Sequence, residues 1–497
     1  MTDATNTPLP PSARPALWTA AEAAAASGGK ASGDWTCTGV SIDSRTVGAG
    51  DLFIAIAGPT HDGHAFVADA LAKGAVAAMV HAVPEGFSQP EKLLVVDDTF
   101  AGLQALGRAA RERLTGKVIA VTGSVGKTGT KEMLALACAR LGGGAVHATQ
   151  GNLNNHWGLP LTLARCPRDA AWCILEMGMN HAEEIRPLSR LAKPHVAVIT
   201  AVEAVHLEHF DSVEGIARAK AEIMDGVVEG GTAVLPRDNP HHSLLLATAE
   251  RLDLRTTSFG AHIHASARLL HTNTTDTGLR VLADFYGANL EYTVGATGRH
   301  WAINSLAVLA AIRAAGGDAA EAALALSAMT PPKGRGKRQS ISLPESRGGG
   351  LLTIIDESYN ASPVSMRAAL TVLDGMTPGR GGRRVAVLGD MLELGGESDA
   401  LHAGLADAVS GSRIDRVHTC GTHMAHLASA LPQDRRGRHA DDSTALAQLV
   451  AADVRGGDVV MVKGSLGSRM ATVLEALLAL DADGKGGGTD HDDTGNG

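Results

Sequence analysis

The segment at residues 118–133 combines the residue types that hold the phosphates of a nucleotide. The apolar run VIAV (118–121) comes before GSVGKT (123–128), and apolar residues at helical spacing follow it. Glycines let successive backbone N–H groups point inward, and the N-terminus of the following helix adds partial positive charge. The pattern has Val121 where the usual phosphate-binding loop has its first glycine, so we interpret it as a variant loop. The predicted phosphate-binding residues are Gly123, Ser124, Val125, Gly126, Lys127 and Thr128.

Oxygen and nitrogen donors for a metal follow the next predicted strands. Glu176 comes directly after AWCIL (171–175), at the carboxyl end of a predicted strand, where it could hold Mg²⁺ together with the Thr128 hydroxyl. His206 and His209 follow the predicted strand HVAVIT (195–200). Their H-x-x-H spacing allows zinc, but no H-E-x-x-H helix or cysteine partner supports it, so we favour a second Mg²⁺ held by His206.

Lys220 lies in a predicted helix, within the run IARAKAEIM (216–224). Each of these candidates has an ordinary alternative: a strand, turn and helix with an incidental Lys127, a surface-loop Glu176, and a solvated Lys220. Most lysines on helices are exposed, so composition alone favours the solvated interpretation of Lys220.

Composition limits the class of protein. The chain has 497 residues, 44% of them hydrophobic and 20% charged, which predicts a globular protein of about three domains. A net charge of −9 argues against a nucleic-acid partner. The five cysteines show no C-x-x-C spacing, so we expect reduced thiols and a cytoplasmic protein. We expect no membrane insertion, because no leader or sufficiently long apolar run is present.

Strand-like and helical patterns alternate along the chain and predict an α/β fold in three domains. A small α/β domain at 1–114 ends in a helix for which Thr99 is the expected cap. A central domain at 115–329 has a mainly parallel sheet with antiparallel additions. After a linker at 331–338, a domain at 330–482 is expected to contain four strands. The Gly/Asp-rich tail at 483–497 is expected to be disordered.

Ten segments, taken in order, resemble the Mur ligases, the ATP-dependent amide-forming enzymes of bacterial cell-wall precursor synthesis. They are GSVGKT, GNLNNHWGLPLTL, LEMGMNH, VHLEHF, ARAKAEI, GRHWAIN, GRGKR, DESYNASP, LGDMLELGGES and VKGSLGSRM. The likeness as a whole runs from about residue 39 to residue 470. Within the family, the set is most similar to the ligases that add D-alanyl-D-alanine to UDP-N-acetylmuramoyl-tripeptide. The chain departs from the pattern at Trp301, where many relatives carry Asn.

The resemblance implies an N-terminal domain for the uridine nucleotide substrate, a central ATPase domain and a C-terminal Rossmann-like domain. It implies ATP and Mg²⁺ as cofactors, no nucleic acid, and a monomer. Lys220 matches the lysine that the family carbamylates, which would make it an anionic metal ligand beside Thr128, Glu176 and His206. The catalytic set would be Lys127, Lys220, His206 and Arg335. Nucleotide contacts would include Asn304, Arg335 and Asp356, and substrate contacts Ser44, Arg45, Asn155, Tyr359 and Asn360.

The implied reaction is phosphorylation of the tripeptide carboxylate by ATP, attack of the dipeptide amine on the acyl phosphate, and release of phosphate. Two alternatives stay open. One is another amide ligase of the superfamily, similar to folylpolyglutamate synthase or cyanophycin synthetase. The other is a non-catalytic phosphate-loop protein, which would not need Glu176, His206 and Lys220 together.

Overall fold

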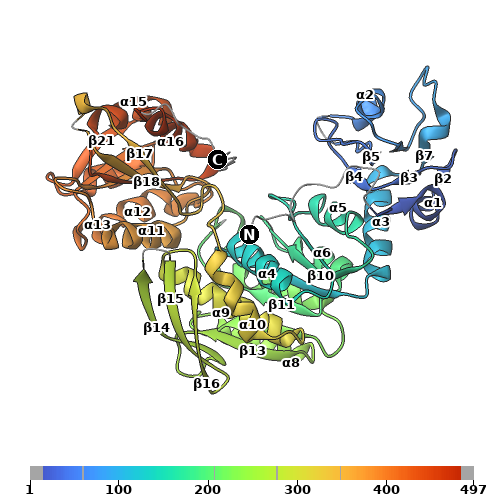
Figure 1. Ribbon diagram of the computed structural model, residues 1–497, viewed down its shortest axis with the longest axis horizontal. Helices are drawn as coiled ribbons and strands as arrows, with labels where there is room; N and C mark the ends of the chain where they lie inside the picture. Colours follow the sequence, from blue (N-terminus) through green and yellow to red (C-terminus); the bar gives the residue numbers. More distant parts are fainter. Residues whose placement is uncertain (1–14, 59–60, 206, 276–277, 348, 483–497) are drawn as a thin grey trace, which may run out of the picture.

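The computed structural model describes residues 15–58, 61–205, 207–275, 278–347 and 349–482. The chain forms three α/β units in sequence order, with the N-terminal and C-terminal units on opposite sides of the central one (Figure 1). The predicted three-part α/β fold is therefore confirmed. The lead-in at 1–14 and the tail at 483–497 lie outside the described residues.

The central unit is built on a nine-stranded sheet in the order β16-β15-β14-β13-β12-β11-β8-β10-β9. Strands β9 to β14 and β8 pair in parallel, and β15 and β16 extend the sheet in antiparallel pairs, as predicted. The strands are β8 (Lys117–Thr122), β9 (Ala145–Ala148), β10 (Ala170–Glu176), β11 (Val196–Ile199), β12 (Thr232–Pro236), β13 (Arg255–Gly260), β14 (Ala267–Thr275), β15 (Gly278–Phe285) and β16 (Ala288–Val294).

Helices cover both faces of this sheet, so its inner strands are apolar on both sides. In β8, Ile119 and Val121 pack on one face and Val118 and Ala120 on the other. The first face is covered by α4 (Lys127–Leu141), α9 (Arg299–Ala314) and α10 (Ala319–Ala325). The second is covered by α5 (Gly158–Ala164), α6 (Ile185–Ala192), α7 (Val213–Ala221) and α8 (His242–Arg251). The carboxyl ends of β8, β10 and β11 consequently meet at one edge.

The N-terminal unit has a five-stranded sheet in the order β2-β7-β6-β5-β4 and a separate pair, β1 with β3. Its elements are β1 (Trp18–Thr19), α1 (Ala20–Ser27), β2 (Lys30–Ala31), β3 (Thr36–Cys37), β4 (Gly39–Ser41), β5 (Asp51–Ile54), α2 (Val67–Ala72), β6 (Ala77–Val80), β7 (Leu93–Val95) and α3 (Thr99–Arg113). The expected cap of α3 was wrong. Asp98 caps this helix by accepting the Ala101 N–H, because Thr99 is already inside its first turn.

The C-terminal unit has a six-stranded sheet in the order β17-β18-β22-β19-β20-β21, and β17 is antiparallel to β18. Its strands are β17 (Lys337–Ser342), β18 (Leu351–Glu357), β19 (Arg384–Gly389), β20 (Arg416–Cys420), β21 (Arg436–Ala440) and β22 (Val459–Lys463). Its helices are α11 (Pro363–Gly375), α12 (Ser398–Ala403), α13 (Ala406–Ser410), α14 (Met424–Ala430), α15 (Ser443–Asp453) and α16 (Ala471–Leu478). The four predicted strands are present as β18, β19, β20 and β22, but the edge strands β17 and β21 were missed, because many of their residues are exposed and they lack a continuous apolar pattern.

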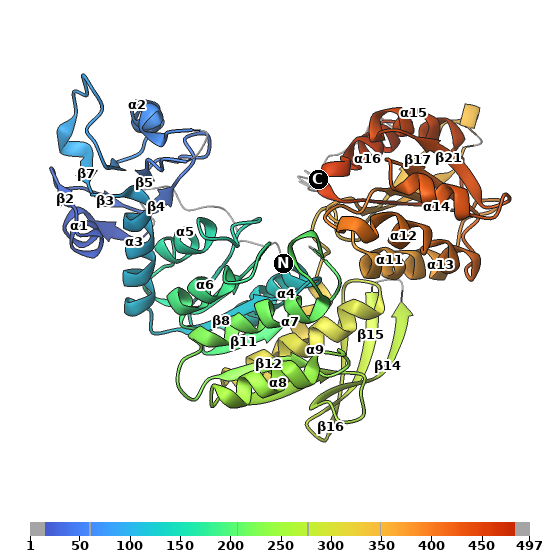
Figure 2. The same ribbon diagram turned by 180° about the vertical axis from the view of Figure 1, so that it is seen from behind.

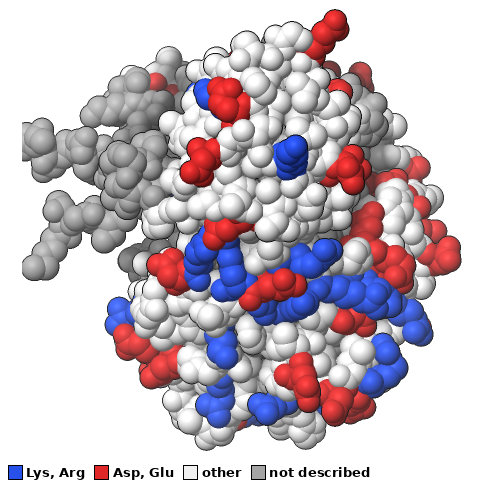
Figure 3. Space-filling model, turned by 90° about the vertical axis from the view of Figure 1, so that its right-hand side faces the viewer, with Lys and Arg blue, Asp and Glu red and all other residues white. Residues whose placement is uncertain are grey.

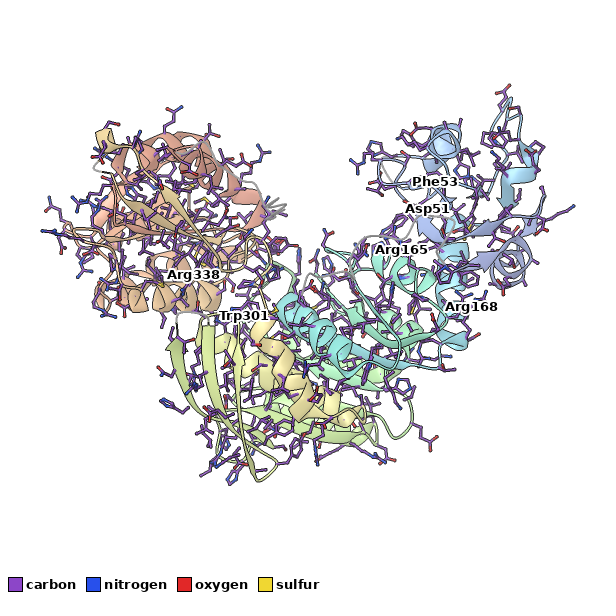
Figure 4. The ribbon with its side chains drawn as sticks, viewed as in Figure 1. Asp51, Phe53, Arg165, Arg168, Trp301 and Arg338 are labelled. Atoms are coloured by element: carbon purple, nitrogen blue, oxygen red, sulfur yellow. The ribbon has the colours of Figure 1, made fainter. Side chains whose placement is uncertain are left out.

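Both outer units are joined to the central one by specific contacts. Leu161 and Ala164 of α5 belong to the same apolar cluster as Leu103 and Leu106 of α3. Arg165 Nε donates to the Val40 carbonyl (2.6 Å), and Figure 4 shows Arg165 and Arg168 near the N-terminal unit. On the other side, Arg338 donates to the Thr297 hydroxyl (2.6 Å). The V-shaped arrangement leaves the N-terminal and C-terminal units apart (Figure 2).

Charge is distributed unevenly over the surface. On the face seen in Figure 3, Lys and Arg side chains gather in a band that acidic side chains flank and interrupt. This band coexists with the net charge of −9 of the whole chain. Among the described residues, none of the helices combines the length and the apolar character needed to cross a bilayer.

Candidate active site

The predicted phosphate loop connects β8 to α4 and requires glycine at two positions. Gly123 and Gly126 have φ values of 150° and 85°, which side chains rarely adopt. A Cβ at Gly126 would lie 2.7 Å from Asn304 Nδ2. The Asn304 amide is thus packed directly against the loop. Its predicted contact with a nucleotide stays a prediction.

The end of β11 anchors this loop. Ser124 N–H donates to the Ala201 carbonyl (2.8 Å), and Ser124 Oγ accepts the Glu203 N–H (2.9 Å). Thr200 Oγ1 donates to the Val125 carbonyl (2.5 Å). These bonds fix the loop backbone before any ligand binds, which lowers the cost of ordering it around a phosphate.

Lys127 begins α4 and is folded over the loop, where its Nζ donates to the Gly123 carbonyl (2.6 Å). Desolvation lowers the pKa of Lys127, the Glu176 carboxylate raises it, and Arg335 lowers it. Glu176 of the central unit and Arg335 of the C-terminal unit thus both act electrostatically on this ammonium group.

Glu176 ends β10 beside Val121 of β8 and is 2% exposed. Its Oε1 accepts a hydrogen bond from Asn154 Nδ2 (2.8 Å), while its buried Oε2 has no hydrogen-bond partner among the described residues. A buried carboxylate oxygen left without a partner is costly unless a cation or donor approaches it. An Mg²⁺ ion fits this position, because Mg²⁺ takes oxygen ligands from one or two carboxylates and from nucleotide phosphates.

The other predicted metal ligands have different outcomes. Thr128 lies in the first turn of α4, at the loop. His206 lies outside the described residues. His209, which was not chosen as a ligand, pairs with Glu208 (3.2 Å). The centroid of its ring lies 4.3 Å from the centroid of the His181 ring. Within the described ranges, no group of three or more His, Cys, Asp or Glu could hold a metal.

Lys220 is 2% exposed on α7, and the solvated interpretation of this residue is wrong. Burial lowers the pKa of Lys220 well below its ordinary value, and the nearby Lys127 lowers it further. A lysine with a depressed pKa presents a neutral, nucleophilic amine. Carbamylation needs such an amine, so the environment of Lys220 suits the modification that the resemblance implies.

In the C-terminal unit, Tyr359 contacts Arg335 and Asp356 holds the segment that carries it. The guanidinium carbon of Arg335 lies 4.1 Å from the Tyr359 ring centroid. Asp356, which is buried, accepts the Gly334 N–H at Oδ2 (2.9 Å) and the Ser358 hydroxyl at Oδ1 (2.6 Å). Asp356 thus holds the segment that carries Arg335, in addition to any contact it makes with a nucleotide.

Three family models match consecutive parts of the chain. The Mur ligase family catalytic domain matches residues 36–110, the Mur ligase middle domain matches 121–312, and the Mur ligase glutamate ligase domain matches 344–466. A curated relative from Bacillus subtilis, UDP-N-acetylmuramoyl-tripeptide--D-alanyl-D-alanine ligase, is 35% identical over 88% of this chain and 93% of its own length. The chain belongs to the Mur ligase family. The Escherichia coli protein of the same name is 34% identical to this Mur ligase, over 89% of this chain and 94% of the relative.

Solved structures agree with this family. Crystal structure I of MurF from Acinetobacter baumannii has a TM-score of 0.78 and 28% identity, and covers 93% of this chain and 98% of that one. MurF ligase from Thermotoga maritima in complex with ADP has a TM-score of 0.72 and 26% identity, over 88% and 96% of the two chains. The fold of this Mur ligase is therefore shared with structures of known ligases.

The substrate residues predicted for this Mur ligase lie in three places. Ser44 and Arg45 lie in a loop of the N-terminal unit, where Arg45 is 85% exposed and pairs with Asp43 (2.7 Å). Asn155 accepts the Trp157 and Gly158 N–H groups at the start of α5, so its carboxamide oxygen has a structural role. Tyr359 and Asn360 follow β18.

Sequence analysis missed Asn154, the residue that orients Glu176. Asn154 and Asn155 are neighbours in GNLNNH, so the motif indicated that an asparagine reaches the site but not which of the two it is.

The C-terminal unit also has a cavity of about 370 Å³ at the carboxyl edge of its sheet. Its lining includes Asp390, Asp442 and Arg469.

Proposed function

We propose that this Mur ligase uses ATP to join D-alanyl-D-alanine to UDP-N-acetylmuramoyl-tripeptide, the final step of UDP-muramoyl-pentapeptide synthesis for peptidoglycan. The observation that carries this proposal is similarity over nearly the full length to ligases of that name, the Bacillus subtilis protein at 35% identity over 93% of its length. Lys127 supplies a cation for phosphoryl transfer, and the buried Glu176 and Lys220 would supply a carboxylate and, once Lys220 is carbamylated, a second anion.

A carboxylate does not acylate an amine at neutral pH, so the tripeptide carboxylate needs a leaving group. Attack of this carboxylate on the γ-phosphorus of ATP gives an acyl phosphate and ADP, and attack by the dipeptide amine then expels phosphate. Lys127 and the loop N–H groups bind the transferring phosphoryl oxygens, and Glu176 with Thr128 would hold Mg²⁺. When bound, Mg²⁺ would neutralise the negative charge of the ATP phosphates. No protein nucleophile takes part.

Lys220 and His206 complete the proposed metal ligands, with Lys220 as the carbamate. The neutral amine expected from the depressed pKa of Lys220 supports this assignment. Asn304 would contact the nucleotide, since its amide is packed against Gly126. Asp356 would join it there while holding the Arg335 segment.

Arg335 would stabilise the transferred phosphoryl from the C-terminal unit, with residues 331–338 as hinge. The proximity of Arg335 to Lys127 supports this role. The separation of the outer units supports a closing movement that brings Ser44, Arg45 and the uridine nucleotide toward Asn155 and the loop (Figure 2). The cavity beside Asp390 and Arg469, together with Tyr359 and Asn360, would receive the dipeptide, because it offers both charges to a zwitterion.

We also propose that the domains are 1–114, 115–329 and 330–482, that the enzyme works as a monomer, and that it acts in the cytoplasm, where ATP and the nucleotide-linked precursor are available. The matched family regions at 36–110, 121–312 and 344–466 fall inside these domains and support the division.

The deciding experiment measures phosphate release from ATP with UDP-muramoyl-tripeptide, with and without D-alanyl-D-alanine. D-Glutamate and diaminopimelate serve as control amines. We expect release that depends on both the tripeptide and the dipeptide. Phosphate release that depends on a different amine would support the ligase mechanism but identify another amine substrate. Phosphate release that does not depend on any of the amines would contradict the proposal.

A further inference from the structure

Two charged side chains that the proposed mechanism does not use meet at the carboxyl edge of the C-terminal sheet. Glu357 ends β18 and Lys463 ends β22, and the two residues are register partners in neighbouring parallel strands. The Lys463 side chain is only 3% exposed, and its Nζ lies 3.3 Å from Glu357 Oε2. A buried ammonium group is stable only when it is paired and hydrogen-bonded.

Lys463 also makes a bond that reaches beyond this pair. Its Nζ donates to the Asn360 carbonyl (2.9 Å), in the segment that follows β18. The lysine therefore fixes the backbone of this segment relative to the end of β22. Removing the ammonium would leave the Asn360 carbonyl without this donor and Glu357 without its cation.

The segment held by Lys463 carries Tyr359, which determines where Arg335 can lie. The Tyr359 N–H donates to the Gly334 carbonyl (3.2 Å), and the Tyr359 ring lies 4.1 Å from the Arg335 guanidinium carbon. Contact between the two segments is close, because a Cβ on Gly334 would lie 2.7 Å from Tyr359 Cβ. A shift of Tyr359 would therefore displace Arg335.

The same pair faces the central unit. His300 lies at the start of α9, and the charged groups that influence it are Glu357, which raises its pKa, and Lys463, which lowers it. Desolvation is the larger effect and lowers the pKa of His300. Glu357 and Lys463 thus act electrostatically on His300 of the central unit, as Arg335 does on Lys127.

We infer that Lys463 is a positioning residue for phosphoryl transfer: by holding the Asn360 carbonyl and the Glu357 carboxylate, it fixes Tyr359 and so aims Arg335 at the phosphate loop. This inference rests on the proposed function, in which Arg335 stabilises the transferred phosphoryl. Lys463 acts through Arg335 and does not touch the reacting atoms.

A double-mutant cycle tests this connection. Lys463→Met keeps the length of the side chain but removes its charge, Arg335→Ala removes the group that is positioned, and the double variant combines them. Lys117→Met is the control, because Lys117 is an exposed lysine at the start of β8, outside the proposed hinge. The measurements are kcat and the KM for ATP in dipeptide-dependent phosphate release, with melting temperature as the check on folding.

We expect Lys463→Met to lower kcat roughly 10- to 100-fold with little change in the KM for ATP, since an interaction used mainly in the transition state is weakened. The double variant should be no slower than Arg335→Ala alone, and Lys117→Met should match the wild type. Independent, multiplying losses in the double variant would overturn the inference, as would wild-type kcat in Lys463→Met.

Failure of the proposed function gives a different result, because wild-type enzyme would then show no dipeptide-dependent release at all. If wild type is active but Arg335→Ala is unimpaired, the role of Arg335 fails and the inference fails with it.

Should Lys463→Met not fold, Glu357→Gln replaces it in the cycle. That change weakens the hold on Lys463 while keeping an acceptor, so we expect a loss of a few-fold in kcat that disappears in the Arg335→Ala background. A loss that persists there would overturn the inference.

Discussion

The indole of Trp301 lies against the backbone of Gly129, in the first turns of the helix that begins at the phosphate loop. A Cβ at Gly129 would lie 2.8 Å from Trp301 Cζ3 and 2.9 Å from Cη2. Trp301 is 4% exposed and belongs to the apolar cluster beneath α4 and α9. Trp301, the position at which the chain departs from the expected family pattern, is therefore a packing residue, and Gly129 is the small partner that makes room for it.

This contact predicts that Gly129→Ala destabilises the protein. Overpacking of a buried site costs about 1–3 kcal/mol, which exceeds the helix propensity gain of about 1 kcal/mol for Ala over Gly. Urea denaturation should show a lower free energy of unfolding, and the KM for ATP should rise because the loop shifts with α4. Gly375→Ala is the control, since nothing lies within 4 Å of its added Cβ at the end of α11. Equal stability of the two variants would contradict the predicted clash.

Lys127→Met should reduce substrate-dependent phosphate release by a factor on the order of 100–1000, as loss of a preorganised charge at a transferred phosphoryl does. The fold should persist, because Lys127 is only half-buried and bonds its own loop at the Gly123 carbonyl. Lys117→Met, at the exposed start of β8, should retain wild-type turnover. Normal rates in the Lys127 variant would refute the phosphate-loop assignment.

Glu176→Gln should raise the Mg²⁺ concentration needed for half-maximal activity, because the amide offers a weaker ligand than the carboxylate. Its Oε2 has no other partner among the described residues, so the change should show little loss of stability without Mg²⁺. Thermal melting with ADP, with and without Mg²⁺, provides a readout independent of turnover. An unchanged Mg²⁺ effect on melting would exclude Glu176 as a ligand.

Local pattern predicted the elements of this site better than the contacts between them. The apolar run before GSVGKT and the placement of Glu176 after AWCIL were sufficient to predict strands whose carboxyl ends meet, and the structure confirms both. The burial of Lys220 was not predictable from its own helix, because the cover comes from other parts of the central unit. The inferred role of Lys463 likewise could not be predicted from its own strand, because it depends on the pairing of Lys463 with Glu357 in the neighbouring strand. Edge strands β17 and β21 were missed because exposed strands carry little apolar signal.

The environment of Lys220 predicts a specific dependence of stability on pH. Burial holds the pKa of Lys220 well below 10.5 in the folded protein, whereas the unfolded chain regains the ordinary value. Between these two values the unfolded state binds the proton and the folded state does not, so the free energy of unfolding rises with pH by up to about 1.4 kcal/mol per unit. The contribution is fully present above 10.5 and is lost as pH falls toward the folded pKa.

Lys220→Met keeps the length of this side chain and removes its titration. The free energy of unfolding is measured with urea in CO₂-free buffer at several pH values from roughly 7 to 9, below the ordinary lysine pKa. Wild type should gain stability relative to Lys220→Met as the pH rises. Added bicarbonate should stabilise wild type alone, because only a neutral amine at position 220 can form the carbamate. Parallel stability curves for the two proteins would show that Lys220 is not neutral when folded. Parallel curves together with no bicarbonate effect would remove the basis for Lys220 as a metal ligand.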